Sequence, residues 1–403
     1  MTALDFYPES LPMNAKNRRR LRILLVLLAA LAVTLLFRWR QAERLRAESA
    51  APDPKQSEIQ TAPLPAAEPT VPDVTAEPVT EAPTEPEPSP TPEPVHYSID
   101  EAALAAPAPD PACYGESDDP AVLAALLETE RAKALIGEES VVWTPDTPLF
   151  PESVLRWYLD DTILVIVWQE VEAQAVGTFS EVFIADGSQL RRKICGDELF
   201  NFEFETTTAF ARDTNAVLAF GGDFYHHARA CGVGVYQREL FRFSPGNADT
   251  CYVTADGDLL LSPWGSETDE EQTRQFIRDN DVVFSLCFGP ILINEGVNVT
   301  PYDYWWGEVR EGYARAVLGQ MGRHHYLCMN INCGYGEYYN LPMLWQAAEA
   351  MERRGAWKAY TLDGGQTATT VLGGELINPV QFGKQTIISD IIYFASAVPE
   401  ERR

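Results

Sequence analysis

The chain has 403 residues, 46% of them hydrophobic, and a formal net charge of −28 at pH 7. The charge is uneven, because residues 1–50 sum to +5, residues 51–95 to −8 and residues 96–403 to −25. An acidic region of this kind repels a phosphate backbone, which excludes nucleic acid as its partner. Its many carboxylates leave a divalent cation as a candidate cofactor.

The N-terminal part of the chain contains one apolar run, residues 23–37, interrupted only by Thr34 and preceded by five basic residues. A helix of fifteen residues spans roughly 22 Å, slightly less than a hydrocarbon core of ~30 Å, and Leu21 and Trp39 extend it. We therefore predict a transmembrane signal-anchor helix at residues 21–39. The basic flank places residues 1–20 in the cytoplasm, so we expect a single-pass protein of the cell membrane whose remaining chain is extracytoplasmic.

A cleaved signal peptide is the alternative for this segment, because the apolar core of a signal peptide is often this short. Four arginines between residues 38 and 46 occupy the stretch where a small-residue cleavage site would follow. This crowding favours the anchor.

Residues 40–95 form a linker rich in Pro, Glu and Thr. Thirteen of the 29 prolines lie in residues 51–95. Such a composition buries no core and favours extended polyproline II, so we predict a disordered spacer of ~3.1 Å per residue. It would hold a globular domain, residues 96–403, away from the membrane.

Hydrophobic periodicity predicts the elements of this domain. In chain order we expect a helix at 119–136, strands at 162–171, 176–184, 215–220 and 233–236, two strands within 282–293 around Gly289-Pro290, and a strand at 326–331. A helix capped by Asn340 and ended by Gly355, a strand at 356–362, a hairpin at 367–377 and a strand at 387–394 complete the pattern. The mixture indicates an α+β fold with mixed or antiparallel sheets and a few packed helices.

Three segments carry candidate chemistry: residues 219–225, 313–319 and 361–369. The first and third each end an apolar strand and place one aspartate, Asp223 or Asp363, beside paired glycines. Glycines let a ligand approach the backbone, and turn amides bind anions. The middle segment supplies Arg315, whose planar guanidinium suits a phosphate. Each segment alone is also compatible with an ordinary turn or an ion pair.

These segments, in this order, resemble the phosphodiester glycosidase family over about residues 210–395. Matching positions are Gly222 to Tyr225 in the first segment, Arg315 and Gly319 in the second, and Leu362 to Gly365 with the following hairpin in the third. Gly221 stands where the family usually has Asn, and Ala314 and Ala316 replace a Pro and a Thr.

The resemblance implies a hydrolase that cleaves the glycosidic bond of a sugar-1-phosphodiester in an envelope or extracellular glycan. It implies catalytic roles for Asp223, Asp363 and Arg315, with Arg191, Arg192 and Lys193 as candidate helpers against the anionic substrate. The expected substrate-binding residues are Gly222, Tyr225, His226, Gly364, Gly365, Gln366 and Thr367. Which aspartate acts as base or nucleophile stays open.

Two alternatives come from other functional classes. A non-catalytic glycan-binding or exopolysaccharide-assembly protein would use the same fold. A zinc protein would use the paired histidines, each pair followed by a cysteine, because imidazole and thiolate are good zinc ligands. The candidate ligands would be His227, Cys231, His325 and Cys328. Their spacing matches no zinc motif, so we expect no metal site there.

Overall fold

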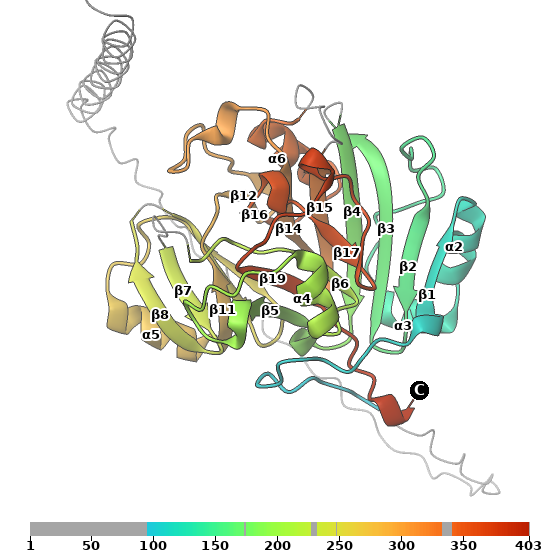
Figure 1. Ribbon diagram of the computed structural model, residues 1–403, viewed down its shortest axis with the longest axis horizontal. Helices are drawn as coiled ribbons and strands as arrows, with labels where there is room; N and C mark the ends of the chain where they lie inside the picture. The colour runs from blue at the N-terminus through green and yellow to red at the C-terminus, as the bar shows by residue number, and fades with distance from the viewer. Residues whose placement is uncertain (1–94, 173–174, 227–231, 247, 333–340, 403) are drawn as a thin grey trace, which may run out of the picture. The chain divides into compact units, whose positions relative to one another are not determined.

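The structure is a computed structural model that describes residues 95–402, except 173–174, 227–231, 247 and 333–340 (Figure 1). The predicted tail, the predicted anchor at 21–39 and nearly all of the predicted linker lie outside the described residues. Within the described part, no helix is long and apolar enough to cross a membrane.

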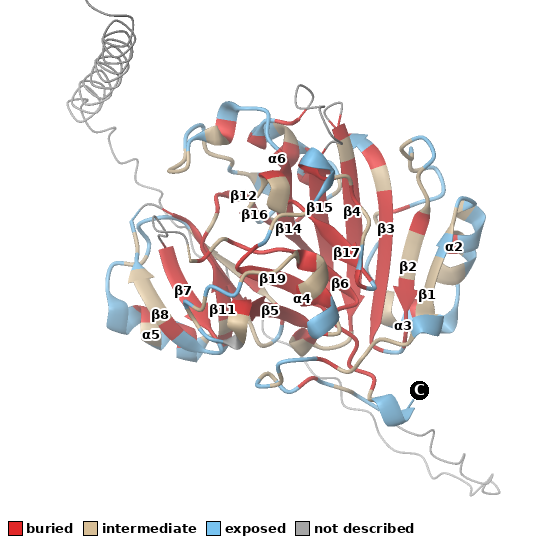
Figure 2. Cartoon of the chain, in the orientation of Figure 1, coloured by how far each residue is buried: buried red, intermediate tan, exposed pale blue. Residues whose placement is uncertain are grey.

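The largest sheet has nine antiparallel strands. Its order is β1 (Tyr114–Ser117), β2 (Leu155–Leu159), β3 (Ile163–Glu172), β4 (Ala175–Ile184), β15 (His325–Asn332), β14 (Arg315–Gly322), β16 (Lys358–Leu362), β12 (Ile291–Asn294) and β13 (Val297–Asn298). The long strands β3, β4 and β15 are almost wholly buried (Figure 2), and β3 and β4 are rich in the β-branched and aromatic residues that suit such positions.

A second sheet has five antiparallel strands, in the order β18 (Glu375–Leu376), β17 (Thr370–Leu372), β6 (Leu218–Gly221), β19 (Asp390–Phe394) and β5 (Leu190–Ile194). Two small sheets complete the domain. They are β10 (Leu259–Ser262), β9 (Thr250–Thr254) and β11 (Val282–Leu286), and the hairpin β7 (Gly232–Tyr236) with β8 (Glu239–Ser244).

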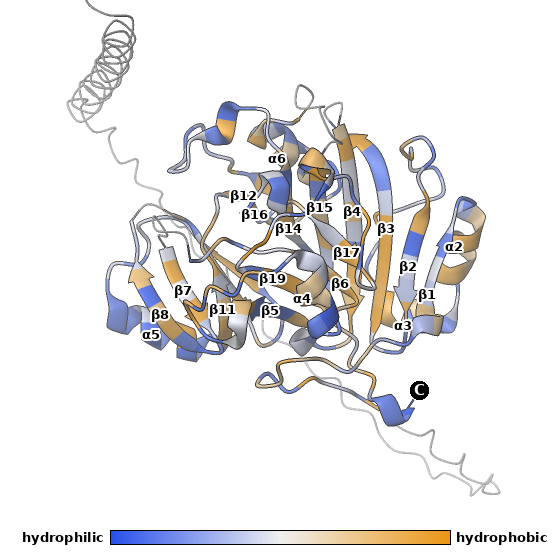
Figure 3. Ribbon diagram, viewed as in Figure 1, coloured by the Kyte–Doolittle hydropathy of each residue, from blue (hydrophilic) through white to orange (hydrophobic). Residues whose placement is uncertain are grey.

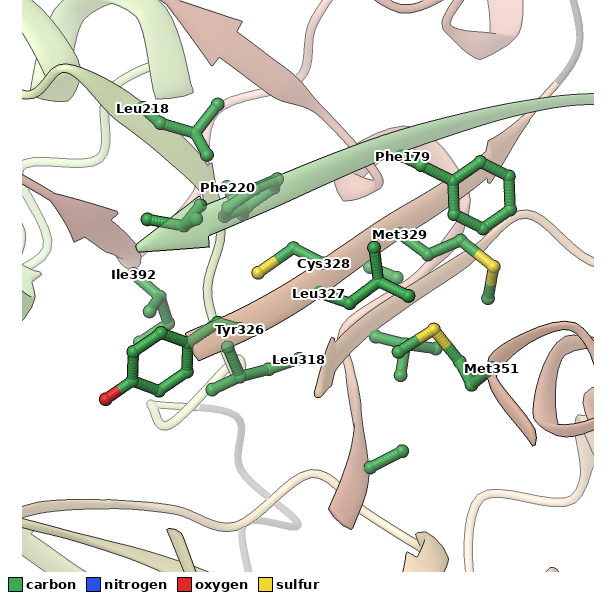
Figure 4. Close-up of a cluster of buried hydrophobic side chains, with 14 of the residues drawn as sticks. Phe179, Leu218, Phe220, Leu318, Tyr326, Leu327, Cys328, Met329, Met351 and Ile392 are labelled. Atoms are coloured by element: carbon green, nitrogen blue, oxygen red, sulfur yellow. The ribbon is translucent and has the colours of Figure 1, made fainter. Parts of the chain in front are cut away.

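The main core lies between the five-stranded sheet and the nine-stranded sheet. Alternate residues of β6, Leu218 and Phe220, belong to this core with Ile392 of β19 and Tyr326 of β15 (Figure 4). Ala219, which lies between the two β6 residues, belongs to a separate cluster on the outer face. This alternation is the two-residue period of a strand buried on both faces.

Helices cover the outer faces of both sheets. Helix α4 (Thr207–Asp213) packs on the five-stranded sheet through Phe210 and Ala211. Helix α6 (Leu344–Glu352) packs on the nine-stranded sheet, where Met351 lies near β14 and β15 (Figure 4). Helix α5 (Glu270–Asp279) buries only Thr273 and Ile277, and its residues other than Phe276 and Ile277 are hydrophilic (Figure 3).

The predicted α+β class with antiparallel sheets is confirmed, and three local predictions need correction. The predicted helix at 119–136 is two helices, α2 (Pro120–Leu127) and α3 (Glu130–Ile136), because Thr129 caps a new N-terminus. Helix α6 begins at Leu344, and Met343 is its N-cap residue. The predicted cap, Asn340, lies outside the described residues. The two strands within 282–293 form as β11 and β12, but they belong to different sheets.

Candidate active site

The predicted site segments meet where the two large sheets join. The Asp363 N–H, just past β16, donates to the Gly222 carbonyl, just past β6, at 3.1 Å. The Gly222 N–H in turn donates to the carbonyl of Asp390 at 3.0 Å. In the β14–β16 register Ala316 lies opposite Leu362, so Arg315 lies beside the same end of β16. Segments more than a hundred residues apart therefore form one site.

Two of the site glycines are required by close backbone packing. A Cβ at Gly222 would lie 2.2 Å from the Asp390 Oδ2 atom, and a Cβ at Gly364 would lie 2.3 Å from the Ala314 carbonyl oxygen. The Asp390 carbonyl oxygen would also lie 2.6 Å from a Cβ at Gly222, so backbone atoms block both positions. The glycines therefore let the two turns cross, and Gly365 extends this contact by donating to the Ala314 carbonyl at 2.9 Å.

Two cavities open at this crossing, and Asp363 and Phe224 line both of them. The first, which we call the aromatic cavity, has a volume of about 260 Å³ and is lined in addition by Phe288, Trp305, Trp306, Glu308, Tyr313, Arg315, Thr361, Leu362 and Gly364. The second, the acidic cavity, has a volume of about 140 Å³ and is lined in addition by Phe204, Gly222, His226, Thr367, Ile387, Ile388, Ser389 and Asp390.

Asp363 has the electrostatics of an acid–base residue. Burial raises the pKa of this carboxyl to about 7, and the negative charges of Asp390 and Asp223 act in the same direction. A hydrogen bond from the Thr367 side chain opposes the rise in pKa. A carboxyl that titrates near neutral pH at the border of two cavities is suited to proton transfer or nucleophilic attack.

Asp223 is not exposed to either cavity. Its Oδ1 atom pairs with Arg192 at 2.5 Å, and its Oδ2 atom accepts the backbone N–H of Cys287 at 2.7 Å. Arg192 also reaches Asp390 at 3.0 Å, and all three side chains are at most 1% exposed. Burial raises the pKa of Asp223, and the Arg192 charge opposes the rise. Because both oxygens have donors, Asp223 supports the turn rather than faces a substrate.

Arg315 lines the aromatic cavity, but backbone carbonyls hold most of its guanidinium. Nε donates to the Pro342 carbonyl at 3.3 Å, and Nη2 donates to the carbonyls of Glu308 and Glu311 at 2.7 and 2.8 Å. Burial lowers the pKa of the guanidinium to about 10, which leaves it charged at neutral pH. None of these bonds uses Nη1. The Nη1 end is therefore the part of the guanidinium that can reach a phosphate.

The remaining predicted binding residues divide into two groups. His226 and Thr367 line the acidic cavity, and the His226 ring lies 4.4 Å from that of Phe204. Tyr225 is buried beneath the site, where its ring lies 5.4 Å from the Arg192 guanidinium. Gln366 is half-buried in the turn and lines neither cavity.

Of the three candidate helper cations, Arg192 belongs to the buried cluster, whereas Arg191 donates to Tyr393 and to the carbonyls of Asp100 and Ala103. Lys193 lies between Arg192 and Ile194 on β5, and it lines neither of the two cavities.

Of the four candidate zinc ligands, only His325 and Cys328 lie within the described residues. His325 is bonded to Glu181 at 2.9 Å and stacks on Phe183. Cys328 is a free thiol in the main core, and burial raises its pKa (Figure 4). His227 and Cys231 lie outside the described residues. Among those described, no group of three His, Cys, Asp or Glu side chains is placed to hold a metal ion.

Sequence reasoning missed Asp390 as a site residue. It begins β19 and lines the acidic cavity, and its pairing with β5 brings it to Arg192. Unlike the other two aspartates, Asp390 precedes its apolar run, Ile391–Phe394, and has no glycine pair beside it. The pattern that identified Asp223 and Asp363 therefore gave no signal for Asp390.

Comparisons with known proteins support the resemblance. Residues 214–395 match the family model of the phosphodiester glycosidase domain. The structure is similar to the catalytic domain of zebrafish N-acetylglucosamine-1-phosphodiester alpha-N-acetylglucosaminidase auto-inhibited by its pro-peptide, with a TM-score of 0.44 and 17% identity over 58% of this chain and 83% of that chain. It is also similar to a hypothetical protein from Synechocystis, with a TM-score of 0.43 and 12% identity over 62% of this chain and 64% of that chain. No curated protein matches the sequence.

Proposed function

From the phosphodiester glycosidase domain at residues 214–395, we propose that this chain is a hydrolase that cleaves the glycosidic bond of a sugar-1-phosphodiester. The observation that carries the proposal is the position of Asp363. Its carboxyl, with a pKa of about 7, lies at the border between an aromatic cavity that contains Arg315 and an acidic cavity that contains Asp390.

The two cavities suit the two halves of such a substrate. The broad rings of Trp305, Trp306 and Tyr313 form apolar walls, and Arg315 supplies a positive charge beside them. A phosphate monoester is a weakly basic leaving group, so it needs charge stabilisation more than protonation. We assign that task to the Nη1 end of Arg315, and binding of the sugar hydroxyls to the acidic cavity, where His226 and Thr367 line the wall.

Asp363 is then the catalytic carboxylate. In its ionised form it either takes a proton from a water molecule that attacks the anomeric carbon, or attacks that carbon itself to form a glycosyl ester, which water then hydrolyses. The bond between the anomeric carbon and the phosphate-ester oxygen breaks, and its electron pair leaves with the phosphate. Asp223 acts as a positioning residue, because Arg192 and Cys287 occupy both of its oxygens.

The N-terminal sequence adds a location to the proposal. A signal-anchor at 21–39 and a proline-rich spacer would hold the domain outside the cytoplasm, where envelope glycans are accessible. Protease added to intact cells should then release the domain, and protection of the domain until lysis would reverse the assigned orientation.

A non-catalytic glycan-binding protein is the second candidate. It is favoured by the carbonyl-bonded state of Arg315 and by Gly221 at a position where the family usually has Asn. Such a protein would bind a sugar phosphate without turning it over.

The deciding experiment uses the purified full chain and methyl phosphodiesters of N-acetylglucosamine 1-phosphate, glucose 1-phosphate and galactose 1-phosphate. Release of free sugar from one of them, lost in Asp363→Asn, is the expected result. Binding of all three without release of sugar would reject the hydrolase and favour a non-catalytic glycan-binding protein.

A further inference from the structure

A third cavity lies beside the candidate active site, and neither the catalytic chemistry nor the sugar accounts for it. It has a volume of about 560 Å³, within the range typical of small-molecule sites. Trp305 lines both this cavity and the aromatic cavity that contains Asp363 and Arg315. The two cavities therefore adjoin at Trp305, and we call this third space the apolar cavity.

The walls of the apolar cavity are aromatic and aliphatic. Trp264 and Tyr304 face it with Trp305, and Ile291 and Val299 are its aliphatic neighbours. Trp264 is 60% exposed and Val299 is 46% exposed, although both are large apolar side chains. Exposed apolar surface gathered around one hollow is typical of a binding site.

The polar groups around this cavity are largely bonded to other parts of the protein. The Asp249 carboxylate accepts the backbone N–H groups of Trp264 and Ile291, each at 2.8 Å, and the Trp305 indole N–H donates to the Phe288 carbonyl at 3.3 Å. Asp303 pairs with Arg310 at 2.8 Å. These bonds fix the rings and leave few groups to recognise sugar hydroxyls, so the wall selects for an apolar ligand.

The geometry points to a phosphodiester whose aglycone is hydrophobic, such as an alkyl or prenyl chain. The sugar and phosphate would lie at Asp363 and Arg315, and the hydrocarbon would pass Trp305 into the apolar cavity. This inference rests on the proposed function and adds the class of the leaving group to it.

The test uses n-alkyl phosphates, because they are the leaving product whatever the sugar is. Butyl, hexyl and octyl phosphate are titrated against the full chain in lipid nanodiscs, with empty nanodiscs as the blank. Transfer of each methylene out of water predicts an affinity gain of about fourfold per CH₂. Trp264→Gln and Val299→Asp should reduce that gain to less than about twofold, because they make the cavity polar. Trp345→Gln alters another exposed tryptophan, one that does not line the cavity, and should keep the full gain.

Three results would overturn the inference: an affinity independent of chain length, the same chain-length gain in the two cavity variants as in the wild type, or displacement of octyl phosphate by chitotriose through the same residues.

Failure of the proposed hydrolysis is separate, because binding of an alkyl phosphate breaks no bond. A chain-length gain that is lost in the cavity variants, without turnover of any diester, would reject the hydrolase and keep the apolar site. Turnover of diesters at a rate independent of the aglycone would keep the hydrolase and reject the apolar site.

Discussion

At the scale of single residues, the proposed chemistry depends on Asp363, whose carboxyl has a pKa close to neutral pH because of its surroundings. Burial raises its pKa from the ordinary 3.8 to about 7. If the ionised form is the catalyst, kcat/KM should rise with pH through about 7 and level off above it. A pH–rate profile of the purified chain checks this. A flat profile, or activity that falls as pH rises through 7, would contradict the role of the ionised carboxylate.

The same pKa makes a separate prediction for stability. Between pH 4 and 7 the folded chain holds a proton on Asp363 that the unfolded chain has lost, so this residue lowers the free energy of unfolding as pH rises. The free energy of unfolding of Asp363→Asn, relative to that of the wild type, should therefore be greater at pH 8 than at pH 4. Urea melts of both proteins at the two pH values measure this. An equal difference at both pH values would show that the carboxyl is not perturbed.

Arg315 gives a third prediction at this scale. Lysine keeps a charge but cannot bond the carbonyls of Glu308, Glu311 and Pro342 together. Arg315→Lys should lose about 2–3 kcal/mol of stability along with its activity. The matched control is Arg310→Lys, because Arg310 is exposed and pairs with Asp303, so its cost should stay below about 1 kcal/mol. Loss of activity at full stability would restore the phosphate fork as the main role of Arg315.

At the scale of elements, strand β5 connects the five-stranded sheet to the three-stranded sheet. Arg192 of β5 joins Asp390 of β19, Asp223 of the turn after β6 and the carbonyl of Ser285 in β11. One buried cation thus connects the five-stranded and three-stranded sheets beneath the site. Its removal would leave two buried carboxylates without a counter-charge.

We therefore expect Arg192→Met to cost about 3–5 kcal/mol, measured by urea denaturation. Arg238→Met is the control, because Arg238 forms surface pairs with Glu101 and Asp281 and should cost at most about 1 kcal/mol. The double variant Arg192→Met/Asp223→Asn should recover part of the loss, since it removes one unpaired charge. Strictly additive effects would mean that the pair is not coupled.

A comparison of β5 with other strands shows where the sequence predicted the fold and where it did not. The strands β3, β4, β15 and β17 follow from their apolar or β-branched runs, and the hairpin glycines at 373–374 set its turn. In contrast, Arg191, Arg192 and Lys193 are three adjacent cations, a pattern typical of a surface, and yet they are buried in β5. Their burial depends on partners far away in the chain, such as Asp390, which no local pattern reveals.

The candidate site was predictable to a similar extent. Asp363 and Arg315 were identified from strand-end chemistry and family resemblance, and they line one cavity. The aromatic wall was not identified, because the segment Tyr304–Trp306 matches no periodic pattern and approaches Phe288 only through the fold. The enclosed position of Asp223 likewise depends on the Cys287 N–H, which lies 64 residues further along the chain.

At the scale of the whole domain, two stacked sheets bring three strand ends together: those of β6 and β16 and the start of β19. The arrangement places Asp363 where the cavities meet, next to Leu362, which belongs to the main core and also lines the aromatic cavity. The central claim is that this site breaks the bond between the sugar and the phosphate ester, not a phosphorus–oxygen bond.

Hydrolysis in ¹⁸O-labelled water tests that claim most directly. A methyl phosphodiester of the sugar 1-phosphate that the full chain turns over is incubated in H₂¹⁸O, and both products are analysed by mass spectrometry. We expect the label on the anomeric oxygen of the released sugar, unlabelled methyl phosphate, and no labelled product from Asp363→Asn. Label in the phosphate, or labelled sugar at an unchanged rate from Asp363→Asn, would contradict the account.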